Sequence, residues 1–434
     1  MYKIYPDKIL KKFANLQFAL NLLFIISIVI ALGTIIPQDQ DISFYQTNYP
    51  AILPLFGFVS WKFILFFNFD HIYSSYWFFL LLIVFGASLL SCTLTVQFPV
   101  LRRLRRWQFS KKEDKISNNE KFLPSSRINS LNYNLHLCDY IIFRQGRKNY
   151  AYSGLLGRFG PIVVHASIIL LLLGTIIGNL GGYIAQEFVP RGEIFHSQNL
   201  TKVGSISVLP QNLSWRVNDF WIKYNDKLTT SQYYSDLSLL DSSGNEITRK
   251  TVFVNEPLVY KGITIYQTDW DIVGLKYAIN GKSTQQLFLK KIKKFNQNFW
   301  FGSVTVNTLL GDSKTLSLLC KDLSGNIYLY DNNGKLINEF KQGQILTLDS
   351  NTNIQIKEIL TNTGLQIKTD PGIKTIYFSF FLLMLSTYTS FISYSQIWGL
   401  EKDKLIEITG NSNRAKLFFQ SQFKNLIMKI PSET

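Results

Sequence analysis

The chain has 434 residues, of which 47% are hydrophobic, 15% are aromatic and only 17% are charged, a composition typical of a membrane protein with a sizeable polar part and not of an ordinary soluble protein. Its formal net charge of +16 is partly concentrated beside hydrophobic segments, in LRRLRRW and in Lys111 to Lys115, so the charge indicates membrane topology and not nucleic-acid binding. The three cysteines form no CxxC pair, which excludes a redox pair, a zinc knuckle and a haem attachment motif of that type.

Two transmembrane helices are expected in the first part of the chain, residues 1–97. They cover residues 18–36 and 76–96, and the second leads directly into the arginine cluster, so that end is expected on the cytoplasmic or stromal side. The apolar stretch Ala51 to Phe69 contains proline, glycine and lysine, and we expect it to be interfacial or re-entrant. No cleavable signal or transit sequence is expected, because the first apolar run is too long for a signal peptide.

A third helix is expected over residues 161–185, because about 20 apolar residues at a rise of 1.5 Å match a hydrocarbon core of about 30 Å. It follows a basic loop over residues 98–160, whose last part, YIIFRQGRKNYAYSG, is expected to form a small hairpin. Gly174, Gly178 and Gly182 are spaced four apart, which predicts a helix face that another backbone can approach closely.

The long segment over residues 186–371 is expected to be a mostly antiparallel β domain of sandwich or barrel type, because its short alternating runs are separated by turn signals. A fourth helix over residues 372–398 returns to the basic side, where the tail of residues 399–434 stays. The expected fold is therefore a membrane protein with four transmembrane helices and a large mostly-β extramembrane domain between the third and the fourth.

His165 is the one histidine inside a predicted span, about one turn in from the helix end at Gly160. An ionisable side chain at that depth is costly when it faces lipid, so it should face protein, water or a ligand. Neutral imidazole binds iron well, and an apolar helix bundle suits a flat macrocycle such as haem. A histidine that is only hydrogen-bonded between helices fits the same pattern equally well.

The other histidines are weaker candidates. His71 precedes the second helix at the expected outer surface, where it could bind a metal or haem, whereas His136 and His196 are expected to have surface or structural roles. A haem held by two histidines would need a partner chain, because the predicted spans contain no second histidine. The sequence has no GxSxG, P-loop, HExxH or Rossmann motif, so we assign no catalytic residue.

Several stretches resemble a known family when they are taken together in chain order. They are ALGTIIPQ, YWFFLLLIVFGASLLSC, GLLGRFGPIVVHASIILLLLGTIIG, VNEPLVYKGITIYQTDW, DPGIKTIYFSFFLLMLSTYTSFISYSQIWGL and the tail motif GNSNRA. In these stretches the chain is similar to the ResB/CcsB family of System II cytochrome c biogenesis, specifically to its cyanobacterial and plastid branch.

The resemblance implies a subunit of a cytochrome c haem attachment complex. Such proteins act with a CcsA-type partner, which carries a tryptophan-rich haem-handling motif that this chain lacks. Together they move haem across the membrane and attach it to apocytochrome c, so the chain would be a component of a cytochrome c synthase and not catalytic alone. His165 matches the family histidine implicated in intramembrane haem ligation, with haem b as a transient substrate. Where many relatives carry a histidine near the end of the last helix, this chain has Tyr394.

The family branch implies a multi-pass protein of the plastid (chloroplast) thylakoid membrane, with the β domain in the lumen, or alternatively of a cyanobacterial thylakoid. The expected partners are the CcsA-type protein, apocytochrome c and membrane lipid, without nucleic acid. The alternative function is a non-haem-binding scaffold or an apocytochrome chaperone, in which His165 only packs. A thiol-reductant transporter is disfavoured by the absence of paired cysteines.

Overall fold

The computed structural model describes residues 8–52, 59–100, 121–124, 126, 128–211, 213–225, 230–294, 297–307, 313–349, 352–402 and 405–428. They divide into two compact units, Met1–Ile177 with Gly372–Thr434, and Gly178–Pro371. The arginine cluster LRRLRRW and the block Lys111 to Lys115, on which the predicted topology partly rests, lie outside the described residues.

Three helices of the described chain are long and apolar enough to cross a membrane: Leu16–Ile35, Tyr76–Val100 and Leu156–Gly181. The first is α2, the second consists mainly of α5 (Tyr76–Cys92), and the third is α8. The fourth predicted span corresponds to α9 (Ile373–Ser390), an 18-residue helix that is not one of these three, so its passage through a membrane stays a prediction.

Two of the predicted helix ends differ from the observed ones. Helix α8 begins at Leu156 and ends at Gly181, because Tyr183 and Ala185 alternate into the core of a sheet and begin strand β4 (Tyr183–Pro190). The prediction that the fourth helix reaches residue 398 is wrong. Helix α9 ends at Ser390, and Ser395–Lys402 forms strand β20, whose backbone pairs with two other strands.

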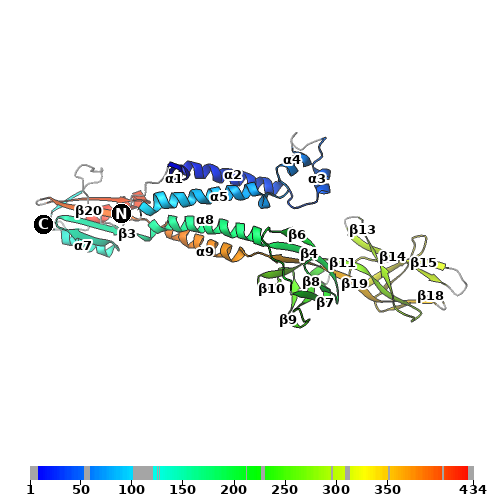
Figure 1. Ribbon diagram of the computed structural model, residues 1–434. Helices are drawn as coiled ribbons and strands as arrows, with labels where there is room; N and C mark the ends of the chain where they lie inside the picture. Colours follow the sequence, from blue (N-terminus) through cyan, green and yellow to red (C-terminus); the bar gives the residue numbers. More distant parts are fainter. Residues whose placement is uncertain are drawn as a thin grey trace. The chain divides into compact units, whose positions relative to one another are not determined.

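Helices α2 and α5 lie side by side in opposite directions (Figure 1). At one end the Ser88 hydroxyl donates to the Phe13 carbonyl over 2.7 Å, and at the other the Tyr73 hydroxyl donates to the Ile30 carbonyl over 3.3 Å. The segment between the two helices contains the short helices α3 (Ile42–Asn48), α4 (Trp61–Phe66) and η1 (Ile72–Ser74), and residues 53–58 of it lie outside the described part. The short helix α1 (Lys8–Phe13) precedes α2.

A small α/β domain joins the middle of the chain to its C-terminal part. Its sheet has the strand order β1 (Lys121–Pro124), β21 (Leu405–Ser412), β20, β3 (Lys148–Ser153) and β2 (Ile141–Gln145). Helices α7 (Ile128–Leu137) and α10 (Lys416–Met428) supply apolar side chains to the same core as the sheet. The predicted hairpin is confirmed as β2 and β3, whereas strands β20 and β21 in the C-terminal part were not expected.

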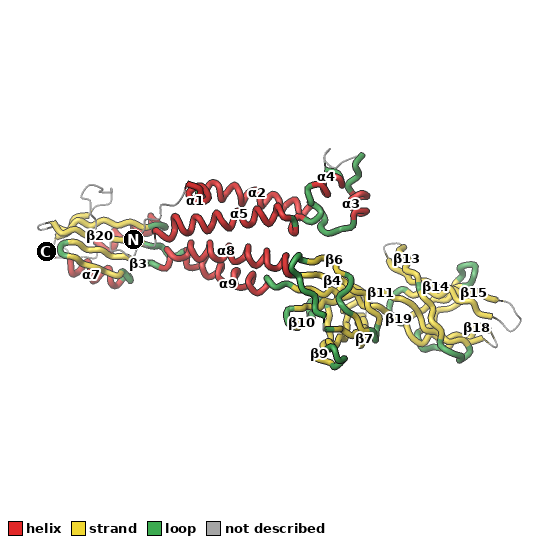
Figure 2. The backbone as a smooth tube through the Cα atoms, in the orientation of Figure 1, coloured by secondary structure: helices red, strands yellow, loops and turns green. Residues whose placement is uncertain are grey.

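In the unit Gly178–Pro371, the described residues after Gly182 form strands and loops (Figure 2). Besides β4, its strands are β5 (Ile194–Phe195), β6 (Leu200–Val203), β7 (Ser214–Tyr224), β8 (Thr230–Leu240), β9 (Glu246–Phe253), β10 (Leu258–Tyr260), β11 (Ile263–Ile279), β12 (Gln285–Phe288), β13 (Lys290–Lys294), β14 (Gln297–Asn307), β15 (Ser313–Cys320), β16 (Asn326–Tyr330), β17 (Leu336–Lys341), β18 (Ile345–Asp349) and β19 (Thr352–Thr369).

Two long antiparallel strands, β11 and β19, organise this β region. Their paired halves contribute to two separate cores, one shared with β7 to β9 and the other with β14 to β17. Register shifts interrupt β11 between Gln267 and Asp269 and between Ile272 and Gly274, near the change from one core to the other. The expected mostly-β region is therefore confirmed, and the paired strands of its described residues are antiparallel.

Candidate functional site

The C-terminal end of α5 changes from α-helix to a single π-helical turn, η2 (Thr93–Gln97), in which the Phe98 N–H bonds to the Thr93 carbonyl. Such turns are uncommon and often occur at functional sites. Thr93 and Gln97 both direct polar atoms at one side chain of α8, namely His165.

The contact with Thr93 decides where the proton of a neutral His165 lies. His165 Nδ1 is 3.0 Å from Thr93 Oγ1, and that hydroxyl donates its one hydrogen to the Leu89 carbonyl over 2.8 Å. The hydroxyl can therefore only accept from the imidazole, so Nδ1 carries the proton and Nε2 keeps a lone pair. A metal-binding histidine is commonly fixed in this way, through a hydrogen bond from its other ring nitrogen.

Gln97 covers the remaining ring nitrogen. Its side-chain Nε2 is 3.3 Å from both nitrogens of His165, and with Nδ1 protonated it can donate only to the lone pair on His165 Nε2. The Gln97 Oε1 is buried and has no hydrogen-bond partner among the residues that the structure describes. An iron atom at His165 Nε2 would thus displace an amide that is itself only partly satisfied.

His165 lies deeper in its helix than the sequence indicated. Because α8 begins at Leu156, the imidazole is about two and a half turns from the helix start, and not one turn from an end at Gly160. On the same side of α8, Ile168, Ile169 and Leu172 pack against the apolar core of α2 and α5. The polar side chains of Thr93, Gln97 and His165 therefore lie at one end of an interface between helices that is otherwise apolar.

His71 lies near the opposite end of α5, beside Asp70. Its Nδ1 is 2.8 Å from Asp70 Oδ2, an arrangement that would leave Nε2 available to a metal, and its side chain is 41% exposed. The stretch of α5 from Tyr76 to Thr93 measures about 25 Å at 1.5 Å per residue, so His71 and His165 cannot bind the same iron. The structure therefore does not bring the two candidate residues together.

His136 and His196 are both exposed, as expected for surface roles. His136 is in the last turn of α7, and His196 Nδ1 is 3.3 Å from the Leu213 carbonyl. No group of three or more histidine, cysteine, aspartate or glutamate side chains that could hold a metal ion occurs within the described ranges. All three cysteines are unpaired, and burial raises the pKa of the Cys320 thiol to about 12.

Tyr394 belongs to a buried aromatic group that sequence reasoning did not identify. Tyr394 follows α9 and is 1% exposed. Its hydroxyl lies 3.1 Å from the Tyr150 hydroxyl, and Gln396 Nε2 donates to the Tyr150 hydroxyl over 2.6 Å. The guanidinium carbon of Arg158, in the first turn of α8, lies 4.9 Å from the centre of the Tyr394 ring. Burial raises the pKa of the Tyr394 phenol, which keeps it neutral. The only signal in the sequence is the alternation of tyrosines in NYAYS.

A cavity of about 670 Å³ lies in the small α/β domain. Its lining combines hydroxyl, amide and apolar groups with one cation and one carboxylate, and includes Asp139, Tyr140, Ser395, Ser412, Arg414 and Phe418. The cavity contains neither His165 nor the side chains that contact it, so it is distinct from the histidine site.

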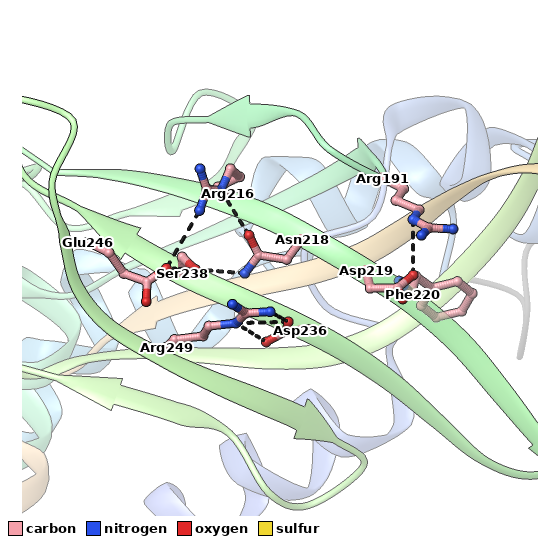
Figure 3. A network of polar contacts seen from close by, with 9 residues as sticks. All are labelled: Arg191, Arg216, Asn218, Asp219, Phe220, Asp236, Ser238, Glu246 and Arg249. Carbon is pink, nitrogen blue, oxygen red and sulfur yellow. Dashed lines mark hydrogen bonds and ion pairs between the residues drawn. The ribbon is translucent and has the colours of Figure 1, made fainter.

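The β region carries a network of charged side chains on β7, β8 and β9, shown in Figure 3. Arg249 Nε donates to Asp236 over 3.0 Å, and Asn218 Nδ2 donates to Ser238 Oγ over 2.6 Å. Arg216 Nη2 lies 3.6 Å from Glu246. Because these groups satisfy one another across neighbouring strands, the network stabilises the sheet and provides no open site.

Comparison with known proteins identifies the relatives of this chain. Residues 16–315 match the ResB-like family. The chain is 52% identical over 431 residues to the cytochrome c biogenesis protein Ccs1 of Emiliania huxleyi, covering 99% of this chain and 97% of that protein. It is 41% identical to Ccs1 of Rhodomonas salina, over 99% and 98% of the two chains, and 39% identical to the cytochrome c biogenesis protein CcsB of Microcystis aeruginosa, over 98% and 95%. With a family match over most of its length and relatives similar from end to end, the chain belongs to the ResB-like family.

Proposed function

We propose that this protein takes part in cytochrome c biogenesis as a membrane subunit that binds haem on its way to apocytochrome c, with His165 Nε2 as an iron ligand. The observation that carries the proposal is the contact between His165 Nδ1 and a Thr93 hydroxyl that has already donated its hydrogen. The relatives in algae and a cyanobacterium, which are named for cytochrome c biogenesis, support it.

The residues of the site would each have a distinct role. Thr93 holds the imidazole in the tautomer with a free Nε2, and Gln97 occupies that nitrogen until haem replaces its amide. The apolar side chains Ile168, Ile169 and Leu172 offer a surface suited to a macrocycle. The second axial ligand would come from the CcsA-type partner, since the other three histidines of this chain lie elsewhere.

The proposed topology has four spans, with α9 as the fourth. Its 18 residues measure about 27 Å, close to the thickness of the hydrocarbon core. Its large apolar side chains remain exposed, as expected for a surface against lipid or a partner helix; they include Tyr377, Phe378, Phe380, Phe381, Met384 and Tyr388. We place this protein in the plastid thylakoid membrane, with its β region in the lumen.

Contacts at one end of the helices support this topology. Ser88 near the end of α5 donates a hydrogen bond to Phe13, which precedes α2. The first part of α8 and the end of α9 lie close together, because a Cβ at Gly160 would lie 2.9 Å from the Ser390 Cα. The start of α2, the end of α5, the start of α8 and the end of α9 thus lie on one side, together with His165. We assign that side to the stroma.

The native cysteines provide a test of this topology. Cys138 is exposed and Cys320 is buried, so a membrane-impermeant maleimide should label the wild-type chain at Cys138 from the stromal face. A Cys138→Ser, Ser283→Cys variant, whose new thiol lies at an exposed position in the β region, should be labelled only from the lumenal face. Labelling of both positions from the same face would contradict the crossing of α8 on which this topology depends.

The second candidate function, a scaffold or apocytochrome chaperone that binds no haem, has one observation in its favour. The Gln97 amide and the Thr93 hydroxyl together satisfy both nitrogens of His165 without a ligand. In that case His165 would only fix α5 to α8.

The two functions differ in what they predict for covalent haem attachment. The chain would be produced with its CcsA-type partner and a c-type apocytochrome in a host that lacks its own haem attachment system. We expect wild type to yield cytochrome with covalently bound haem, and His165→Ala to yield almost none while the two membrane subunits still copurify. Normal attachment by the His165→Ala variant would favour the scaffold.

A further inference from the structure

The first turn of α8 contains a half-buried cation, Arg158, that has no counter-ion in the part of the chain that the structure describes. Among those residues its buried Nε has no hydrogen-bond partner, and no carboxylate lies within ion-pair distance of its guanidinium. The glutamates of the neighbouring strands are paired elsewhere, Glu401 with Arg144 over 3.4 Å and Glu407 with Lys402 over 3.0 Å. A cation held away from water in this way is stabilised when an anion joins it.

Arg158 lies on the same face of α8 as His165. The two residues are seven apart, and at 100° per residue their directions differ by only about 20°, with a separation along the helix of about 10 Å. Side chains in a helix lean towards its N-terminus, so Arg158 extends from the His165 region towards the small α/β domain. A ligand bound at His165 that carries an acidic group on that side would meet the guanidinium.

The guanidinium is already oriented before any ligand arrives. It lies over the ring of Tyr394, where the π-electrons attract a cation, and the Tyr394 hydroxyl is hydrogen-bonded to the buried Tyr150. Because Tyr394 and Tyr150 are each 1% exposed, this support is rigid. A planar guanidinium fixed in this way can donate two parallel hydrogen bonds to one carboxylate.

We infer that Arg158, supported by Tyr394, forms an anion subsite that binds the propionate carboxylates of the haem whose iron is held by His165. The inference rests on the proposed function, because it takes haem as the ligand of His165. Haem matches the arrangement since its iron lies at the centre of an apolar macrocycle and both carboxylates extend from one edge. The subsite would orient haem with its acidic edge towards the stromal end of the helices.

The test compares haem with its dimethyl ester, in which both carboxylates are blocked. Each compound is titrated into the full-length chain in detergent, and binding is followed by the Soret absorption. We expect wild type to bind haem at least about tenfold more tightly than the ester, as for loss of a charge-assisted hydrogen bond. Arg158→Gln should bring that ratio close to one and leave the affinity for the ester unchanged, whereas Arg158→Lys should keep part of the preference.

Controls separate this inference from other roles of Arg158. Arg144→Gln removes a surface cation of the same domain and should leave the ratio as in wild type. Wild-type affinities for both haem and ester in Arg158→Gln would overturn the inference, because the guanidinium would then contribute nothing to haem binding. Equal weakening of haem and ester would overturn it in favour of a structural role. If wild type binds both compounds and His165→Ala binds neither, the proposed function holds even when the Arg158 subsite fails. If wild type binds neither compound, the proposed function and the subsite are both overturned.

Discussion

The two faces of α8 differ in kind. One face is defined by glycines: a Cβ at Gly157 would lie 1.9 Å from the Ile392 carbonyl oxygen, and one at Gly174 would lie 2.9 Å from Ile376. The other face carries His165, with Thr93 and Gln97 of the α5 segment against it. The glycine face packs closely against the backbone and side chains of α9 and the segment after it, whereas the second face directs two polar side chains of the α5 segment at one imidazole. Under the proposed function, a single helix would separate assembly from ligand binding, and substitutions should affect one without the other.

The largest effect is expected on the glycine face. Gly157→Ala places a methyl group against the backbone of Ile392, which cannot move away as a side chain could, so we expect a loss of about 3 kcal/mol or more in stability. The measurement is thermal unfolding of the purified chain in detergent. The matched control is Gly86→Ala, where the nearest atom to the new methyl is a side-chain carbon of Leu172 at 3.6 Å. A Gly157→Ala protein as stable as the Gly86→Ala protein would contradict the packing role of this face.

The next effect is expected at Thr93, and on haem binding alone. Thr93→Val keeps the shape of the side chain but removes the hydroxyl that fixes Nδ1, so haem affinity should fall by roughly 10- to 100-fold, as for other residues that orient metal-binding histidines. Haem titration followed by absorption provides the measurement. Thr95→Val is the control, because the Thr95 hydroxyl donates to the Ser91 carbonyl and makes no contact with His165 among the described residues. Equal losses in both variants would show that the hydroxyl contact is not specific.

Gln97 should have a smaller effect with the opposite sign. Gln97→Leu removes the amide that competes for His165 Nε2, and the loss of one hydrogen bond worth about 1 kcal/mol predicts haem binding tighter by roughly fivefold. The same titration measures it. Weaker binding in this variant would mean that Gln97 contacts the haem itself.

The smallest effect is expected at His71. This residue lies beyond the other end of α5 and pairs with Asp70, so His71→Ala should change the haem affinity of the isolated chain by less than about twofold. Asp70→Asn keeps the histidine and should behave in the same way. Loss of half or more of the bound haem in His71→Ala alone would indicate a second haem site, at the far end of the helix.

The hairpin at Gln145 and Gly146 and the mostly-β region could be predicted from sequence, because turn residues and alternating runs are local patterns. Of the three glycines predicted to form one helix face, Gly174 lies against Ile376 as expected, whereas Gly182 lies beyond the end of α8. The tail strands β20 and β21 could not be predicted with equal ease, because β20 pairs with β3 across about 250 residues. His165 was identifiable as an ionisable group in an apolar run, but its partners were not. The roles of Thr93 and Gln97 depend on α5 lying beside α8 and on a π-turn that has no sequence signature. The position of the Arg158 guanidinium could not be predicted for the same reason, because Tyr394, over which it lies, is more than 200 residues away in the sequence.

The central claim is that His165 binds haem iron, and the most direct measurement is the visible absorption spectrum of the complex purified with its CcsA-type partner. Wild type, His165→Ala, and His165→Ala with added imidazole would be compared at equal protein concentration. We expect the Soret band to be lost in His165→Ala and recovered with imidazole, which can occupy the space of the missing ring. A Soret band in His165→Ala identical to that of wild type would contradict the claim and assign the haem to the partner.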